Sequence, residues 1–185
     1  MRTFLALDLP DEIRSVLADQ ISHLKTANIK GIKWVEKENL HITFQFIGET
    51  QRHDLNNISD IMEDVFCKIP AVSFSSATLE VIPRRDPRLI WISVQAADQK
   101  ISNASKRCKK KLKELGYKIE NKPLKFHITL GRIKKRLPDF FIQEILTAEL
   151  KIGNFEVEKA SLYQSFLRPE GPIYEEIINY YFKKE

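Results

Sequence analysis

Two histidine–threonine pairs are the residues of this sequence best suited to chemistry. His41 and Thr43 lie in the phrase HITF, and His127 and Thr129 lie in the phrase HITL. Imidazole can donate or accept a proton near neutral pH, because its unperturbed pKa is about 6.5. Hydroxyl groups can donate hydrogen bonds to phosphate oxygens and hold a phosphorus atom between an acid and a base. The two pairs therefore predict acid–base cleavage of a phosphodiester.

Strand geometry would place both members of each pair on one face. Each phrase lies in a run that alternates apolar with polar residues, which predicts a β-strand whose side chains alternate between its faces. On this pattern His41, Thr43 and Gln45 share one face, and Phe44 and Phe46 share the other. The apolar faces must pack against helices, so the two histidine faces are expected to meet in a single cleft.

A structural role and a metal site are the alternatives to catalysis. A single His-x-Thr on a strand is uninformative, but its repetition in matching strands favours function. Histidine is also a common metal ligand. A metal site would need a third ligand, and His23 and His53 lie on predicted helical segments without HExxH spacing. We therefore expect catalysis with no metal and no cofactor.

The apolar periodicity predicts the element order β-α-β-β-α-β twice. The offset from His41 to His127 is 127 − 41 = 86 residues, and the offset between the first strands, from Thr3 to Leu89, is 89 − 3 = 86. Equal offsets indicate an internal duplication. Beside the two histidine strands, the sequence predicts strands at 3–9, 32–35, 72–82, 89–95, 117–120 and across 152–167, and helices at 10–24, 55–69, 97–115 and 139–148.

The predicted architecture is an α+β fold with a pseudo-twofold axis. We expect two similar antiparallel sheets that face a central cleft, with the helices outside. Residues 1–185 would form a single bilobal domain, with repeat halves at roughly 1–83 and 88–168 and a closing strand at 172–182.

Composition and charge narrow the class of protein. The hydrophobic content of 43% suits a globular core, and the apolar runs are too short to cross a bilayer. The N-terminus lacks a signal peptide, and Cys67 and Cys108 show no CxxC spacing, so we expect a cytoplasmic protein with reduced cysteines. A net charge of +5, gathered at 84–88, 106–113 and 132–136, suggests a polyanionic partner.

The sequence resembles the two-histidine (2H) phosphoesterase superfamily, and within it the RNA 2′,3′-cyclic phosphodiesterases, also called the 2′-5′ RNA ligase family. The resemblance rests on "TFLALDLPDEIR", "IKWVEKENLHITFQFIGE", "PRLIWISV", "FHITLGRIK" and "SLYQSFLRPEGPIYEEI" and covers nearly the whole chain. It implies that His41 is the proton donor to the leaving ribose oxygen and that His127 is the proton acceptor that activates water. Thr43 and Thr129 would bind the phosphate.

The resemblance also implies a role for Arg132, which would add a positive charge beside the phosphate. Strand parity alone places Arg132 on the face opposite His127, so a bend is needed, and Gly131 could supply it. The family usually has proline before its second histidine, where this chain has Phe126.

The implied activity is hydrolysis of RNA 2′,3′-cyclic phosphodiester ends to a 2′-phosphate. The expected partner is an RNA with such an end, with no membrane and no obligate protein partner. Phe46, Trp34 or Tyr174 could stack a base, although core packing explains each of them equally well. The sequence leaves open 2′-5′ RNA ligation, hydrolysis of a small cyclic nucleotide, and an RNA-binding module without catalysis.

Overall fold

The computed structural model describes residues 1–150, 152–169 and 171–183, and this part of the chain contains four α-helices and nine β-strands. The helices are α1 (Asp11–Lys25), α2 (Leu55–Phe66), α3 (Lys100–Glu114) and α4 (Asp139–Thr147), with 3₁₀ turns η1 (Lys37–Asn39) and η2 (Arg52–Asp54). The strands are β1 (Arg2–Leu7), β2 (Ile32–Trp34), β3 (Ile42–Glu49), β4 (Val72–Ile82), β5 (Leu89–Ala96), β6 (His127–Ile133), β7 (Phe155–Val157), β8 (Lys159–Arg168) and β9 (Gly171–Tyr181).

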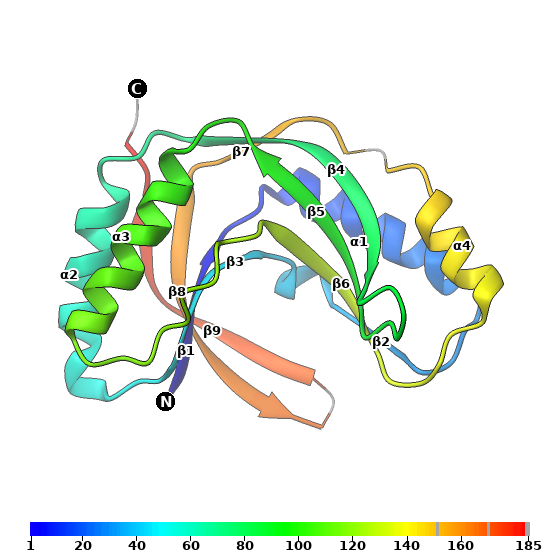
Figure 1. Ribbon diagram of the computed structural model, residues 1–185, viewed down its shortest axis with the longest axis horizontal. Coiled ribbons are helices and arrows are strands. Elements are labelled where there is room, and N and C mark those ends of the chain that lie inside the picture. The colour runs from blue at the N-terminus through cyan, green and yellow to red at the C-terminus, as the bar shows by residue number, and fades with distance from the viewer. Residues whose placement is uncertain (151, 170, 184–185) are drawn as a thin grey trace.

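The strands form one curled antiparallel sheet. Their order is β7-β4-β5-β6-β3-β1-β8-β9, and β2 pairs with β6 beside this path. Figure 1 shows the sheet bent into an arch, with helices along its outer side and the β8–β9 ribbon projecting below it. The predicted α+β class with antiparallel strands and outer helices is confirmed. The two predicted sheets are joined to each other through β3 and β6.

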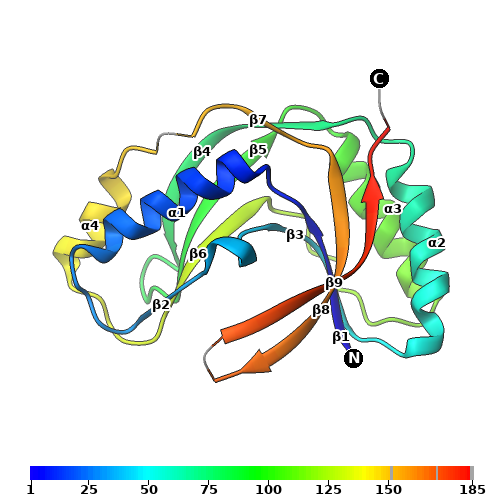
Figure 2. The ribbon, with the colours of Figure 1, turned by 180° about the vertical axis from the view of Figure 1, so that it is seen from behind.

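The two halves of the chain exchange elements. β4, from the first half, pairs with β5 of the second, whereas β8, from the second half, pairs with β1 of the first. On one side of the arch α2 packs beside α3, and on the other side α1 lies with α4 over β4, β5 and β6 (Figures 1 and 2). Each side of the arch is therefore built from both halves.

The first helix, α1, begins and buries its apolar face close to where the sequence predicts. Pro10 directly precedes α1, and Asp11 and Glu12 lie in its first turn, where the helix dipole favours negative charge. The buried face of α1 carries Leu17 and Ile21. Within the described residues, no helix has the length and apolarity needed to span a bilayer.

Both cysteines are free, and Cys108 lies in the core. This side chain is fully buried in α3, with its sulfur 3.7 Å from the sulfur of Met62. Burial raises the pKa of the Cys108 thiol to about 12, so the residue is a packing group rather than a nucleophile. Cys67 is exposed and not bonded to it.

One predicted strand does not form. Residues 117–120 adopt no strand, whereas β2, their expected counterpart, pairs with β6. The Tyr117 hydroxyl donates to the Asp54 carboxylate at 2.6 Å, and Ile119 is buried. The prediction was wrong because side-chain anchors hold this segment near the start of α2, and apolar periodicity does not reveal whether a sheet edge is free to accept a strand.

The register of the first strands also differs from the predicted duplication. Ala6 pairs with Thr43, and Trp91 pairs with Thr129. Ala6 therefore corresponds to Trp91, an offset of 91 − 6 = 85 residues. The offset of 86 holds for the histidine strands, and the predicted value for the first strands was wrong by one residue.

Gly131 lies where β2 approaches β6 most closely. A Cβ added at this glycine would lie 3.1 Å from both Ile32 Cγ2 and Trp34 Cε3. Trp34 is the direct pairing partner of Gly131 and packs against the core. The absence of a side chain at position 131 therefore lets β2 join the sheet.

We predict that Gly131→Val lowers the free energy of unfolding by about 1–3 kcal/mol, because overpacking forces its neighbours apart. Urea denaturation would measure the change. Gly153→Ala is the control, because a Cβ at Gly153 meets nothing within 4 Å and should change stability little. Equal stability of the Gly131→Val variant and the unsubstituted chain would contradict this account of the β2–β6 contact.

Candidate active site

A single backbone pair between β3 and β6 brings the two histidine–threonine phrases together. Ile42 pairs with Ile128, and both side chains are fully buried. Antiparallel register around this pair sets His41 across from Thr129, and Thr43 across from His127. Because residues that flank a pair project to the other face, all four side chains lie on the face opposite the two isoleucines. The register of β3 and β6 therefore places both histidine–threonine pairs on one face of the sheet, as predicted.

The two imidazoles are held in the same way. His41 Nδ1 lies 2.7 Å from the Asn39 carbonyl oxygen, and His127 Nδ1 lies 2.9 Å from the Lys125 carbonyl oxygen. A carbonyl only accepts, so Nδ1 carries the proton and donates in both rings. In each neutral ring Nε2 is left as an acceptor, and the Thr43 hydroxyl donates to His41 Nε2 at 3.1 Å. Both rings therefore present Nε2 for proton transfer.

A β-bulge turns Arg132 to the histidine face. Thr129 pairs with Trp91 and Gly131 pairs with Ile90, which leaves Leu130 without a partner in β5. The extra residue reverses the alternation, so that Arg132 joins Thr129 on one face. The bend that the sequence required for Arg132 is therefore present, at Leu130 and Gly131.

A second bulge corrects the predicted faces of β3. Ala6 pairs with Thr43, and Leu5 pairs with Gln45, which leaves Phe44 as the extra residue. Gln45 is consequently buried with only 8% of its surface exposed, and Phe46 is 65% exposed on the face of Thr43. The prediction that Gln45 shares the histidine face and Phe46 the apolar face was wrong, because alternation along a strand fails at a bulge.

Aromatic side chains pack against both histidines. The centroid of the His41 ring lies 5.2 Å from that of Phe4 and 5.5 Å from that of Tyr174, which meets it edge-on. Trp91 lies against His127 with 4.2 Å between ring centroids. These contacts fix the rings and shield them from water, which strengthens electrostatic interactions at the site.

The remaining sequence candidates lie in different surroundings. Trp34 is half-buried against Gly131, in the β2 contact. Phe126 packs edge-on against Phe74, and its carbonyl accepts from Val94 N at 3.1 Å, so β5 holds the approach to His127. His23 is exposed in α1, away from the paired phrases. No group of three or more His, Cys, Asp or Glu side chains suited to a metal ion occurs among the described residues.

The electrostatic surroundings of the two histidines differ. Burial is the largest effect on each ring and lowers the pKa of both His41 and His127 below 6.5. At His41 the Asn39 carbonyl and, to a smaller extent, the buried carboxylate of Asp8 raise the pKa against this effect, whereas the nearby His127 and Arg14 lower it further. At His127 the opposing influence is the Lys125 carbonyl. A negative charge therefore favours the protonated form of His41 in particular.

Asp8 is a buried acid that the sequence analysis missed. Its side chain accepts from the Tyr163 hydroxyl at 2.7 Å and from the Ser161 hydroxyl, and Lys159 Nζ lies 3.5 Å from Oδ2. Burial and the nearby Asp8 charge raise the pKa of the Tyr163 hydroxyl, so it remains a donor. The available signal was a single acid inside the otherwise apolar strand TFLALDL.

Tyr174 links Arg132 to the histidines. Burial raises the pKa of its hydroxyl, and the charge and hydrogen bonding of Arg132 oppose that rise. Because Tyr174 also meets His41 edge-on, Arg132 and His41 both lie close to one phenol ring. Arg132, the two histidines and the two threonines thus share one site.

We predict that Asp8→Asn lowers the pKa of His41 further and leaves that of His127 unchanged. Removing the carboxylate charge disfavours the imidazolium of His41, while Asn retains hydrogen-bonding atoms at the same position. Histidine titration followed by NMR would measure both values. A pKa of His41 that is unchanged or higher in the variant would contradict the assigned effect of Asp8.

Comparison with known proteins identifies the family to which this chain belongs. The model of the family described as LigT-like phosphoesterase matches twice, at residues 7–91 and at residues 92–174. A protein of Methanocaldococcus jannaschii named RNA 2′,3′-cyclic phosphodiesterase is 36% identical over 183 residues, covering 96% of this chain and 98% of its own length. Its namesake in Archaeoglobus fulgidus is 33% identical over 179 residues, with the same two coverages.

Solved structures show the same fold. The crystal structure of TT0787 from Thermus thermophilus superposes with a TM-score of 0.85 at 24% identity and covers all of both chains. E. coli LigT complexed with 3′-AMP superposes with a TM-score of 0.74 at 20% identity, covering 98% of this chain and 97% of its own. With one family match in each half of the chain and relatives above 30% identity along nearly its whole length, this protein belongs to the LigT-like phosphoesterase family.

Proposed function

We propose that this protein hydrolyses RNA 2′,3′-cyclic phosphate ends to a 2′-phosphate by metal-independent acid–base catalysis. His127 Nε2 takes a proton from water as the water oxygen attacks phosphorus. His41 Nε2 delivers a proton to O3′ as the bond between O3′ and phosphorus breaks. Thr43, Thr129 and Arg132 bind the phosphate oxygens, on which negative charge accumulates.

The observation that carries the proposal is the Ile42–Ile128 pair, which places two imidazoles and two hydroxyls around one point of the sheet. The matching bonds from Nδ1 to Asn39 and Lys125 leave Nε2 of both rings available. The relatives named RNA 2′,3′-cyclic phosphodiesterase support the substrate class, since they match this chain along nearly its whole length.

The assignment of acid and base draws support from Asp8. A general acid must hold its proton until the leaving oxygen develops charge, and Asp8 favours the protonated form of His41. His127 lacks this opposing carboxylate among the influences on its pKa, which suits a base that is neutral before reaction. The proposal therefore gives the two halves of the site different roles.

The wider setting also belongs to this proposal. We take residues 1–185 as a single domain, since the exchange of β4 and β8 makes each half depend on the other. An exposed thiol at Cys67 and a buried one at Cys108 suit a reducing compartment, which supports a cytoplasmic location. The proposal includes no obligate protein partner.

We predict that His41→Ala and His127→Ala each lower kcat by roughly 10²- to 10⁴-fold, the usual contribution of a general acid or base. The assay is turnover of a cyclic-phosphate-ended oligonucleotide in excess chelator, with phosphorus NMR to identify the 2′-phosphate product. His23→Ala, which removes an exposed imidazole elsewhere, should retain full activity. Undiminished turnover in either active-site variant would contradict its assigned role.

We predict a bell-shaped pH profile for kcat/KM with its maximum below pH 6.5. The rate should rise with pH as His127 loses its proton and fall with pH as His41 loses its own, and both pKa values lie below 6.5. Because the two sites interact, the limbs report the pair rather than single residues. A maximum above pH 7.5 would contradict the lowered pKa values.

A further inference from the structure

We propose that the basic end of the sheet beside Arg132 binds the RNA backbone upstream of the cyclic phosphate. The basic end is defined as residues 30–33, 84–88 and 132–136. The inference rests on the proposed function, which supplies the reaction at the 3′ end of the RNA. A 2′,3′-cyclic phosphate lies at the 3′ end of an RNA strand, so the remaining phosphodiesters extend from that end in one direction only. A row of cations that begins at the site would bind them.

Backbone bonds join these three distant segments at one end of the sheet. Ile133 N donates to the Arg88 carbonyl at 2.8 Å, and Lys134 N donates to the Gly31 carbonyl at 2.7 Å. Figures 1 and 2 both show the β4–β5 turn, the segment before β2 and the segment after β6 side by side. The three segments of the basic end therefore lie together at one end of the sheet.

The basic end continues directly from the active site. Lys33 is the pairing partner of Arg132, so the two side chains lie on the same face of neighbouring strands. Lys33 Nζ donates to the Pro169 carbonyl at 2.8 Å, which ties the tip of the β8–β9 ribbon to this end. Strands rise about 3.3 Å per residue, so Lys134 begins within about 7 Å of Arg132 along the chain.

The charge of the chain is concentrated here. Its three segments contain nine cations and one acid, Asp86, a net charge of +8, whereas the whole chain carries +5. The rest of the protein therefore has a net charge of 5 − 8 = −3. Among the ion pairs of the described residues, the basic end contributes only that of Arg88 with Asp86. Its cations are: Lys30, Lys33, Arg84, Arg85, Arg88, Arg132, Lys134, Lys135 and Arg136.

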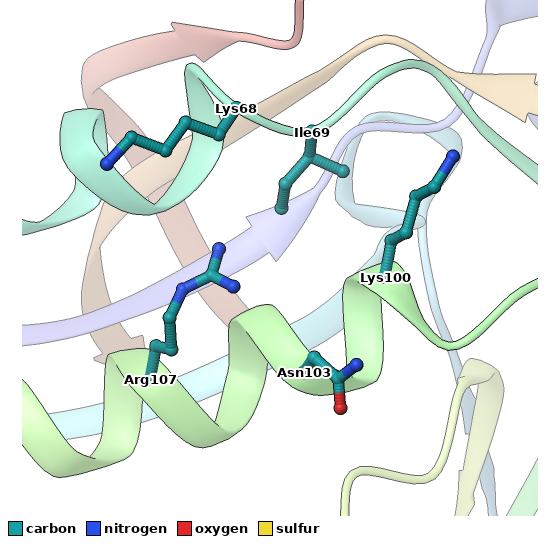
Figure 3. Close-up of a pocket in the computed structure, with 5 residues that line it drawn as sticks. All are labelled: Lys68, Ile69, Lys100, Asn103 and Arg107. Carbon is teal, nitrogen blue, oxygen red and sulfur yellow. The ribbon is translucent and has the colours of Figure 1, made fainter.

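The third basic cluster of the sequence, on α3, is different. Lys111 pairs with Asp64 at 3.1 Å and Lys110 with Glu114 at 3.9 Å. The pocket beside α3 in Figure 3 is lined by three cations together with Ile69 and Asn103, and the charged groups of the cations point in different directions. Two of these cations, Lys68 and Lys100, are paired with Asp64 and Asp98. Two of the six cations at 106–113 are thus ion-paired, compared with one of the nine at the basic end. Counterion release requires cations free to meet phosphates, which favours the basic end over α3.

The test compares two substrates in three double variants, each of which replaces two cations by neutral glutamine. The substrates are an RNA octamer that ends in a 2′,3′-cyclic phosphate and adenosine 2′,3′-cyclic phosphate, which has no upstream phosphate. Arg84→Gln/Arg85→Gln and Lys134→Gln/Arg136→Gln alter the basic end without changing Arg132 or Lys33. Lys106→Gln/Lys110→Gln removes two exposed cations from α3 as the control.

Each basic-end variant should raise KM for the octamer about threefold to tenfold. The slope of the logarithm of octamer affinity against the logarithm of salt concentration should become shallower by about 0.7 for each phosphate that the variant no longer neutralises. KM for the mononucleotide and kcat for both substrates should stay unchanged, as should all values for the α3 control. An unchanged octamer KM in both basic-end variants, or an equal increase in the α3 control, would overturn the proposal.

A binding measurement separates this proposal from the proposed function. Fluorescence anisotropy of a labelled octamer reports affinity whether or not turnover occurs. Binding that weakens in the basic-end variants, without turnover of either substrate by the unsubstituted chain, would refute the proposed function and support the RNA surface. Normal turnover with octamer affinity unaffected by these variants would refute the surface and leave the proposed function intact.

Discussion

The pairing of Ile42 with Ile128 is the contact on which the rest of the site depends. It joins β3 to β6 and thereby converts two similar groups of strands into one sheet. The buried isoleucines fix the core face, so the residues on either side of them must project to the other face. A slip of one residue in either strand would bury a histidine and expose an isoleucine. Hydrophobic burial therefore sets the geometry of the polar site.

The exchange of strands and helices holds this pair in place. β8 completes the side of the sheet that contains β1 and β3, and β4 completes the side that contains β5 and β6. Separation of the two halves would expose the apolar faces that these exchanged elements cover. The site at the centre thus draws its rigidity from long-range packing on both sides of the arch, rather than from local structure around each histidine.

The duplicated site is chemically unequal. Bulges at Phe44 and Leu130 occupy corresponding places in β3 and β6, and each turns the residue two positions later toward the site. That residue is the aromatic Phe46 in the first half and the cationic Arg132 in the second. Asp8 adds a buried negative charge near His41, where Ser161 and Tyr163 offset its desolvation by hydrogen bonding. The two halves of the site therefore share one backbone arrangement but differ in the charges near their histidines.

The sequence by itself predicted the class of reaction and most of the helices and strands. Repetition of His-x-Thr at an offset of 86 residues singled out the four side chains to which the proposal assigns catalysis, because alternation and spacing are local properties that a sequence displays directly. Only the tertiary structure decided that the halves exchange strands, that Gln45 is buried and that Asp8 acts near His41. It also decided that residues 117–120 form no strand and that the 84–88 and 132–136 clusters meet. Each of these features depends on pairing register, bulges or contacts between distant residues. Such features are set by the free energy of the whole fold and cannot be inferred from a local sequence pattern.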